Sequence, residues 1–285
     1  MNTKEKATTS QSAITLEAIR EEKKRLLKTK SNAEVLSILL DDVLPIDFQE
    51  IVYPAIVELK QRLSTETDEE EKEKIMSGIK KHRVTDRQKY VVVIEELLRL
   101  ATLRKWGICK NAAFVYLFNG AFWSELDKEV LQKFLGDSAE NMNMPKYDAR
   151  QYIVRENLFK QFLATGFQAM PENNDKILIN LLNGTFEINE NGKGTLRPVS
   201  KVDFLKYQLS FEYSPDAKCP IFQNFLDVSL PDKSSQSVLA EYIGYVFARH
   251  LKLEKVLILY GNGANGKSVF FEIVSALLGT HNVSN

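Results

Sequence analysis

The stretch VLILYGNGANGKSVFFEIVSALLG, residues 256–279, carries the most specific pattern in this sequence of 285 residues. Its glycine-rich loop fits two phosphate-binding patterns at once. Gly261, Gly263 and Gly266 form the dinucleotide fingerprint G-x-G-x-x-G. The same loop also reads G-x-x-x-x-G-K-S, which is the P-loop pattern. The first pattern indicates a nicotinamide or flavin enzyme, and the second indicates a protein that binds nucleoside triphosphates.

Lys267 and Ser268 favour the P-loop. Both patterns need a strand before the loop and a helix after it. Residues 256–260 predict a strand of a buried parallel sheet, and residues 269–278 predict a helix that Gly279 follows. A dinucleotide loop has no use for lysine and serine after its third glycine, whereas a P-loop lysine reaches phosphates and its serine binds Mg²⁺. We therefore predict a phosphate site made of Gly261, Asn262, Gly263, Ala264, Asn265, Gly266, Lys267 and Ser268, with Ser268 also as the Mg²⁺ contact.

The first part of the chain predicts helices. Residues 1–12 are small and polar, which predicts disorder, and residues 14–30 predict a charged helix. The charge run TETDEEEKEKI at 65–75 is more typical of a solvated helix face or linker than of an acidic interaction site. Apolar residues recur at helical spacing over 90–103. We expect residues 1–104 to be a helical N-terminal region with a disordered start and an acidic linker.

The middle of the chain predicts a small α+β domain over residues 105–230. Asn-Gly pairs tolerate the positive φ of a tight turn and predict two β-hairpins. The first joins FVYLF (114–118) to AFW (121–123), and the second joins ILINLL (177–182) to TFEI (185–188), followed by TLRP (195–198). Helices are predicted at 126–142, 149–166, 221–226 and 238–251. The last of these helices opens a third region, residues 231–285.

The composition is that of an ordinary soluble globular protein. Lys and Arg total 38 and match 38 Asp and Glu, so no global basic field indicates a nucleic-acid partner. Cys109 and Cys219 are far apart, which argues against a disulfide framework or a zinc ribbon and fits a reducing cytosol. We see neither a signal peptide nor an apolar run of ~18 residues, and we expect a cytoplasmic protein with no membrane partner.

Several short motifs together carry a resemblance to a known family. They are the Asn183-Gly184 hairpin, LRP at 196–198, YQL at 207–209, PDAKCP at 215–220, EYIGY at 241–245 and ILYGNGANGKS at 258–268. The Tyr116 hairpin with Trp123 adds to them. The sequence resembles the phage and plasmid primase–helicase family, which are superfamily-three helicases of the poxvirus primase–helicase type. We expect the resemblance to cover residues 105–285, with residues 1 to about 100 outside it.

This resemblance implies a mixed α/β protein in three parts: the helical N-terminal region, the α+β pre-helicase domain, and the first strand, P-loop and helix of an AAA+-like ATPase core. It also implies an ATP-driven 3′-to-5′ DNA helicase that uses Mg²⁺, works as a homo-oligomer, usually a hexameric ring, and replicates a phage, plasmid or integrated element. The family's Walker-B acids and arginine finger would follow residue 285, and the chain ends 17 residues after Ser268. We expect a truncated reading frame or fragment, so whether this chain by itself is an enzyme stays open.

For several acidic, histidine and aromatic residues, a functional role competes with a structural one. Asp41-Asp42 is the main acidic pair of the first hundred residues, and adjacent acids point in different directions, so we predict no primase activity. His82, His250 and His281 are isolated and predict packing or surface roles. Tyr116, Phe118 and Trp123 could stack on bases but are more typical of a core, and Tyr242 and Tyr245 are expected to pack.

Basic residues outside the loop carry weaker signals. Lys80, Lys81, His82 and Arg83 could contact phosphates, although a solvated basic stretch is the simpler interpretation. Arg249 and Lys252 could face a neighbouring subunit. The alternative to a helicase is a non-catalytic DNA-binding or assembly module with an incomplete P-loop. A small P-loop kinase is disfavoured because of the long sequence before the loop. The reading frame after codon 285 distinguishes the helicase from the non-catalytic module.

Overall fold

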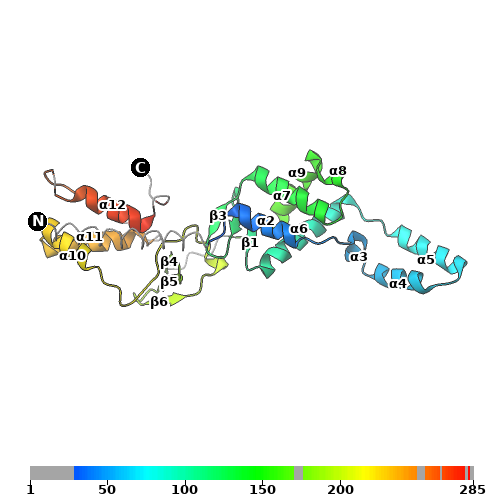
Figure 1. Ribbon diagram of the computed structural model, residues 1–285, viewed down its shortest axis with the longest axis horizontal. Coiled ribbons are helices and arrows are strands. Elements are labelled where there is room, and N and C mark those ends of the chain that lie inside the picture. Colours follow the sequence, from blue (N-terminus) through cyan, green and yellow to red (C-terminus); the bar gives the residue numbers. More distant parts are fainter. Residues whose placement is uncertain (1–28, 170–175, 249–253, 264, 280–281, 283–285) are drawn as a thin grey trace, which may run out of the picture. The chain divides into compact units, whose positions relative to one another are not determined.

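The computed structural model describes residues 29–169, 176–248, 254–263, 265–279 and 282. In this part of the chain eleven α-helices and two three-stranded antiparallel sheets confirm a mixed α/β protein (Figure 1). The chain divides into two compact units. We call residues 30–119 and 124–170 the helical unit, and the remaining residues, mostly 171–285, the C-terminal unit.

The helical unit contains most of the regular structure. Its elements are α2 (Asn32–Asp42), α3 (Phe48–Val52), α4 (Ala55–Thr65), α5 (Glu69–Lys81), α6 (Asp86–Leu103), β1 (Gly107–Asn111), β2 (Phe114–Phe118), α7 (Lys128–Asn141), α8 (Lys146–Ala149) and α9 (Tyr152–Thr165). Strand β3 (Trp123–Glu125) begins with the last residue of the C-terminal unit's segment 120–123 and completes the sheet β1-β2-β3. Ser31, Thr85 and Asp127 cap helices α2, α6 and α7 by accepting hydrogen bonds from first-turn N–H groups.

One hydrophobic core joins residues on both sides of position 104. Helix α6 packs on α9 and β1, and α7 packs on α2, α6 and α9 (Figure 1). Ile94 and Leu97 of α6 and Leu131 and Leu158 of α7 and α9 are buried in this core. The three predicted domain ranges, 1–104, 105–230 and 231–285, stay a prediction.

Helices α4 and α5 form an antiparallel hairpin. Ile56 and Ile75 are buried in it, whereas Asp68, Glu69 and Glu70 at its turn are exposed. The charge run at 65–75 therefore lies on a solvated helix face, as predicted.

The first β-hairpin differs from its prediction. Strand β2 pairs with β1, with Asn111 opposite Phe114, so the tight turn is Ala112-Ala113. Ala112 adopts a φ of 51° there, which the turn imposes despite the absence of glycine or asparagine. Asn119 and Gly120 do follow β2, but β3 starts at Trp123, so residues 121–122 are loop.

The C-terminal unit begins with the second sheet. It contains β4 (Ile177–Leu181), β5 (Gly184–Ile188) and β6 (Gly194–Arg197), in that order, followed by a 3₁₀ turn at Lys201–Asp203. This confirms the second hairpin, although its turn is Leu182-Asn183, one residue earlier than predicted, because Leu181 pairs with Gly184. A Cβ at Gly184 would lie 2.4 Å from the Arg197 carbonyl oxygen, so glycine is needed for the close approach of β5 to β6.

Three helices complete the C-terminal unit: α10 (Pro220–Ser229), α11 (Lys233–Val246) and α12 (Lys267–Leu278). Helix α11 starts five residues before its predicted start because Asp232 caps it, and the end predicted for it at 251 lies outside the described residues. The predicted helix at 14–30 also lies outside them, except for its last two residues.

The strand predicted at residues 256–260 is wrong. This segment forms no ladder within the described residues, and Val256, Ile258 and Tyr260 are 83%, 79% and 94% exposed. A parallel strand exists only through hydrogen bonds to neighbouring strands, and none of the described strands lies beside it.

Candidate functional site

The glycine-rich loop leads directly into helix α12. Gly266 is the N-cap residue of this helix and has a φ of 84°, in the left-handed region that favours glycine. In the described part of the chain no side chain caps the first turn of α12. Its first N–H groups and the positive end of its dipole therefore remain available for an anion.

Lys267 lies folded over this loop. Its Nζ donates hydrogen bonds to the carbonyl oxygens of Gly261 at 2.8 Å and Asn262 at 3.2 Å, and to Asn265 Oδ1 at 2.6 Å. All three acceptors are neutral. A phosphate offers charged oxygens, which form stronger hydrogen bonds with an ammonium group, so the lysine can exchange the loop oxygens for a phosphate.

Close contacts within the protein require one of the three motif glycines, Gly266. A Cβ at this residue would lie 2.9 Å from both Phe225 Cε2 and Ser229 Oγ of α10. A Cβ at Gly261 would lie 2.0 Å from Nδ2 of Asn265, an exposed side chain that can move away. Gly263 has open space around it. The packing of Gly266 on α10 was not predicted, because the sequence pattern assigns the glycine to phosphate binding alone.

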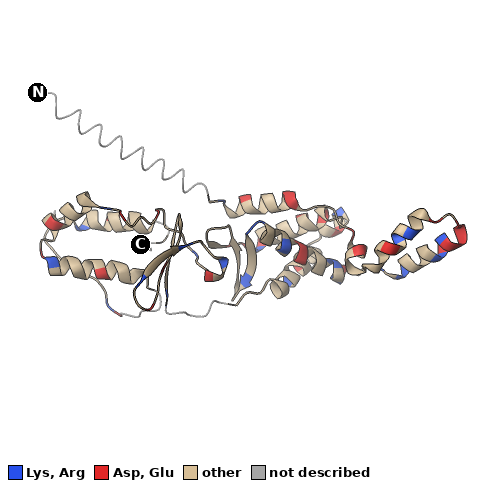
Figure 2. Cartoon of the chain, turned by 90° about the horizontal axis from the view of Figure 1, so that it is seen from below, with Lys and Arg blue, Asp and Glu red and all other residues tan. Residues whose placement is uncertain are grey.

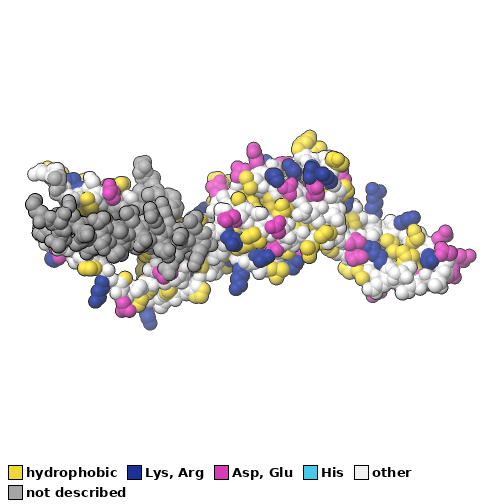
Figure 3. Space-filling view, viewed as in Figure 1, with side chains coloured by type: hydrophobic (Ala, Val, Ile, Leu, Met, Phe, Trp, Pro, Cys, Tyr) yellow, Lys and Arg dark blue, Asp and Glu magenta, His cyan; other side chains and the backbone are white. Residues whose placement is uncertain are grey.

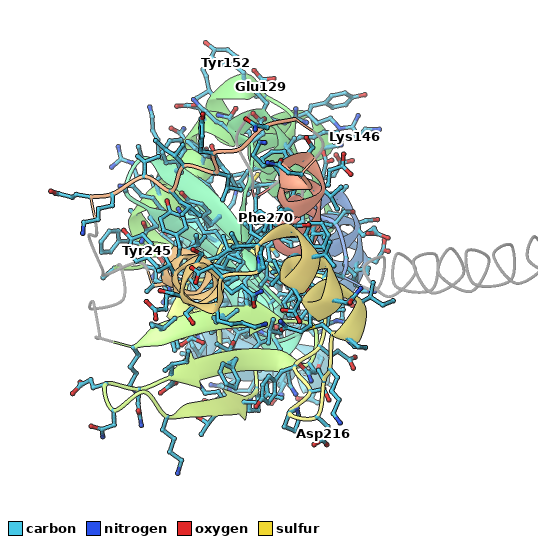
Figure 4. The ribbon with its side chains drawn as sticks, turned by 90° about the vertical axis from the view of Figure 1, so that its left-hand side faces the viewer. Glu129, Lys146, Tyr152, Asp216, Tyr245 and Phe270 are labelled. Atoms are coloured by element: carbon cyan, nitrogen blue, oxygen red, sulfur yellow. The ribbon has the colours of Figure 1, made fainter. Side chains whose placement is uncertain are left out.

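An apolar pocket of about 430 Å³ adjoins the loop. Its lining includes Phe225 and Leu226 of α10, Leu239 of α11, and Lys267 and Phe270 of α12. Figure 4 labels Phe270. Phe270 is buried there, whereas Ile273 and Leu277 of the same helix are 37% and 36% exposed. The volume is within the range of ligand pockets in proteins.

The rest of the predicted site is open to solvent. Asn262, Gly263, Asn265 and Ser268 are exposed, and Ala264 lies outside the described residues. Among the residues that the structure describes, no carboxylate forms a hydrogen bond with Lys267 or Ser268. The loop thus provides hydrogen-bond donors that can bind phosphate, while its role as a nucleotide site stays a prediction.

The aromatic residues that could have stacked on bases are core residues. Trp123 is 1% exposed, donates from Nε1 to the Lys201 carbonyl oxygen at 2.8 Å, and stacks on Phe204 with 5.1 Å between ring centroids. Tyr116 and Phe118 are also buried. The packing interpretation is therefore confirmed for all three, because a base cannot reach a buried ring.

Arg197, in the LRP motif, is the centre of an ion-pair network that was not predicted. Its Nε bonds Glu187 at 2.7 Å, and its two terminal nitrogens bond the carboxylate of Asp203 at 2.8 Å each. Glu187 also accepts a bond from Lys176 at 2.7 Å. These bonds, from Lys176 first and then Arg197, hold the pKa of Glu187 below its ordinary value. The network ties β5 and β6 to the 3₁₀ turn, so the motif has a structural role.

The remaining polar candidates have structural contacts. Asp42 forms a bidentate ion pair with Arg104, at 2.6 and 2.7 Å, and His82 Nδ1 lies 2.9 Å from the Gly78 carbonyl oxygen. No group of three or more His, Cys, Asp or Glu in the described residues could hold a metal. Tyr242 and Tyr245 pack with ring centroids 6.0 Å apart. His250, His281, Arg249 and Lys252 lie outside the described residues.

The two cysteines differ in environment. Both are free thiols; Cys109 is buried in β1 and Cys219 is exposed. Burial raises the pKa of Cys109 to about 12. The thiolate is the reactive form of cysteine, so Cys109 is inert at neutral pH.

Comparison with known proteins identifies the family. A family described as "D5 N terminal like" matches residues 5–231, most of the chain. The match begins far upstream of residue 105, so the expectation that residues 1 to about 100 lie outside the resemblance is wrong. The P-loop lies after the matched segment. No curated protein matches the chain. Across the described residues, no helix is both long and apolar enough to cross a membrane. From the extent of the family match, the chain belongs to the D5 N terminal like family, the N-terminal domain of D5-like primase–helicases of phages and poxviruses.

Proposed function

We propose that this chain is the N-terminal part of an ATP-dependent DNA helicase that replicates a phage, plasmid or integrated element. The family indicates an N-terminal part of a primase–helicase-like replication protein. The observation that carries the finer proposal is Lys267, whose ammonium group lies over a glycine loop at the uncapped start of α12. ATP, Mg²⁺, DNA and a homo-oligomeric, hexameric ring belong to this proposal.

Each part of the loop has a role in the proposed site. The N–H groups at the start of α12 bind phosphate oxygens, and Lys267 supplies a positive charge to them. Ser268 is exposed in the first turn of α12, where its hydroxyl can bind Mg²⁺. The apolar pocket between α10, α11 and α12 provides a surface for a nucleotide base.

Turnover needs more than this loop provides. A carboxylate must hold Mg²⁺ and orient water, and an arginine must stabilise the charge of the transition state. The described residues place no carboxylate in hydrogen-bonding contact with Lys267 or Ser268. This observation favours, as the second candidate, a non-catalytic DNA-binding or assembly module that binds phosphates without hydrolysis.

The test compares two lysine variants. In the full-length protein, Lys267→Ala is expected to abolish ATP turnover, because it removes the charge-assisted contact to the phosphates, whereas Lys255→Ala keeps turnover. Lys255 is exposed and precedes the loop, so it controls for the loss of one charge. Wild-type turnover in Lys267→Ala would overturn the proposal. If the wild-type protein binds ATP without turnover, the second candidate holds.

The isolated chain of 285 residues is expected to bind ATP weakly. Residues 256–260 and much of α12 are exposed, so binding must also order the surroundings of the loop. Isothermal titration calorimetry measures this affinity. A submicromolar dissociation constant would contradict the expectation.

A further inference from the structure

Four exposed cations lie close together where helix α5 leads into helix α6. They are Lys80, Lys81, Arg83 and Arg87, and we call them the basic stretch. None of them has a carboxylate oxygen within 4.0 Å among the residues that the structure describes. The nearby lysines, by contrast, are all paired with Asp or Glu: Lys60, Lys72, Lys74 and Lys89. The basic stretch thus concentrates cations that no acid neutralises.

The protein holds the backbone of the basic stretch in place. Gln49 Nε2 of α3 donates to the carbonyl oxygens of Ile79 at 3.0 Å and His82 at 2.9 Å. The His82 ring packs edge-on against Tyr53, with 5.1 Å between centroids. Thr85 then caps α6. These contacts already fix the backbone of the stretch, so less conformational entropy is lost when the stretch binds a ligand.

Lys80 and Arg83 line an open groove of about 570 Å³. Phe48 and Asn143 are also part of its lining, together with one carboxylate, Asp47. Asp47 is paired with Lys60. Burial acts to raise the pKa of Asp47, but hydrogen bonds from Lys60 and from two backbone N–H groups outweigh this effect and hold its pKa below the ordinary value. The carboxylate is therefore ionised at neutral pH, and Lys60, which also pairs with Glu50, neutralises it only in part. Lys80 and Arg83 outnumber this one carboxylate in the lining, so the groove keeps a net positive charge.

The helix dipole accounts for only two of the four cations of the basic stretch. Helix α5 has Glu69, Glu70 and Glu71 in its first turn and Lys80 and Lys81 in its last, which suits its dipole. Figures 2 and 3 show a cluster of acidic side chains at the outer tip of the α4–α5 hairpin and side chains of both signs at its other end. Arg83, however, lies beyond the end of α5. Arg87 lies in the first turn of α6, where a cation is unfavourable.

We propose that the basic stretch and its groove bind the phosphates of a nucleic-acid strand. From the rise per residue of a helix and of an extended chain, residues 80–87 span at most about 18 Å. One strand of DNA carries a phosphate every ~3.4 Å of its axis, so this span matches about five phosphates. Four unpaired cations within a span this short, two of them lining one groove, suit a polyanion with regular charges. That the nucleic acid is DNA rests on the function proposed above.

The test measures DNA binding by fluorescence anisotropy with the 285-residue chain, labelled single-stranded and duplex DNA, and a series of KCl concentrations. Each lost phosphate contact lowers the slope of log K against log[salt] by about 0.7–0.9, and weakens binding about tenfold at ~0.1 M salt. We expect the variant Lys80→Gln/Arg83→Gln to bind 10- to 100-fold more weakly than the wild type, with a slope smaller by about 1.4–1.8. Both side chains are exposed, and circular dichroism checks that the variant folds.

The matched control is Lys72→Gln/Lys74→Gln. It removes two cations from helix α5, which also carries Lys80, but each is already paired with a carboxylate, so affinity and salt slope are expected to stay near those of the wild type. Three results would overturn the proposal: no DNA binding by the wild type, equal binding by both double variants, or equal displacement of DNA by polyglutamate at the same charge concentration. The last result would assign the groove to an acidic protein.

This test is independent of the test of the P-loop, because the two sets of variants share no residue. If Lys80→Gln/Arg83→Gln binds DNA like the wild type while Lys267→Ala abolishes ATP turnover, only the assignment of the basic stretch fails. If Lys267→Ala retains turnover while the basic-stretch variant loses DNA binding, only the proposed nucleotide site fails.

Discussion

Gly266 offers a sharp test of how the loop is packed. In the variant Gly266→Ala, the new Cβ would lie 2.9 Å from Phe225 Cε2 and from Ser229 Oγ, closer than Cβ atoms approach heavy atoms in proteins. The residue must also keep a φ of 84°, which is unfavourable for alanine. We expect the contact between α12 and α10 to weaken even in the absence of a nucleotide.

The expected cost follows from three contributions. The left-handed backbone costs alanine about 1–2 kcal/mol, and overpacking against α10 costs about 1–3 kcal/mol. Replacing glycine also lowers the entropy of the unfolded chain, which returns about 0.4–1 kcal/mol. The sum is a destabilisation of about 1–5 kcal/mol. Since about 1.4 kcal/mol is a factor of ten in an opening equilibrium, amides of α12 should exchange about 5- to 2,000-fold faster.

Hydrogen exchange followed by mass spectrometry measures this change in peptides that cover α10 and α12. Gly263→Ala is the matched control, because its Cβ would meet nothing within 4 Å and its φ is not positive. It should change stability by less than about 0.5 kcal/mol. Adding Phe225→Leu to Gly266→Ala should recover part of the protection, since it relieves the steric contribution alone. Equal exchange in the two alanine variants would refute the reasoning.

Three further predictions concern other parts of the protein. Gly184→Ala should destabilise the C-terminal unit by about 3 kcal/mol in urea denaturation, because its Cβ would lie 2.4 Å from a backbone oxygen of β6; unchanged stability would show that the strands can separate without cost. Iodoacetamide should alkylate Cys219 in the native protein and Cys109 only after unfolding, as mass spectrometry can determine; native labelling of Cys109 would contradict its burial. The ion pair with Lys176 lowers the folded-state pKa of Glu187, so its stabilisation is complete above the ordinary value of 4.5 and is lost as pH falls through the lower folded value. The melting temperature of the Glu187→Gln variant should therefore fall less than that of the wild type when the pH is lowered from neutral to that acidic range. Equal decreases would contradict the lowered pKa of Glu187.

The sequence by itself determined the elements whose signals are local. Helical spacing predicted α6, α7, α9 and α12, and the glycine after α12 does end it, with a φ of 84°. The repeated Asn-Gly signal predicted the β4–β5 hairpin to within one residue. Short motifs were enough to indicate the primase–helicase family. Spacing, caps and turn residues act over a few positions, so the sequence displays them directly.

Only the tertiary structure decided the features that depend on distant partners. The Ala112-Ala113 turn has no turn signal of its own; the pairing of β1 with β2 imposes it. Residues 256–260 have the apolar composition of a buried strand, but a strand also needs a neighbour, and among the described residues it has none. Likewise, Lys80 and Arg83 look like Lys72 and Lys74 in the sequence. Ion pairs neutralise the second pair and leave the first available, because partner choice depends on how the chain folds.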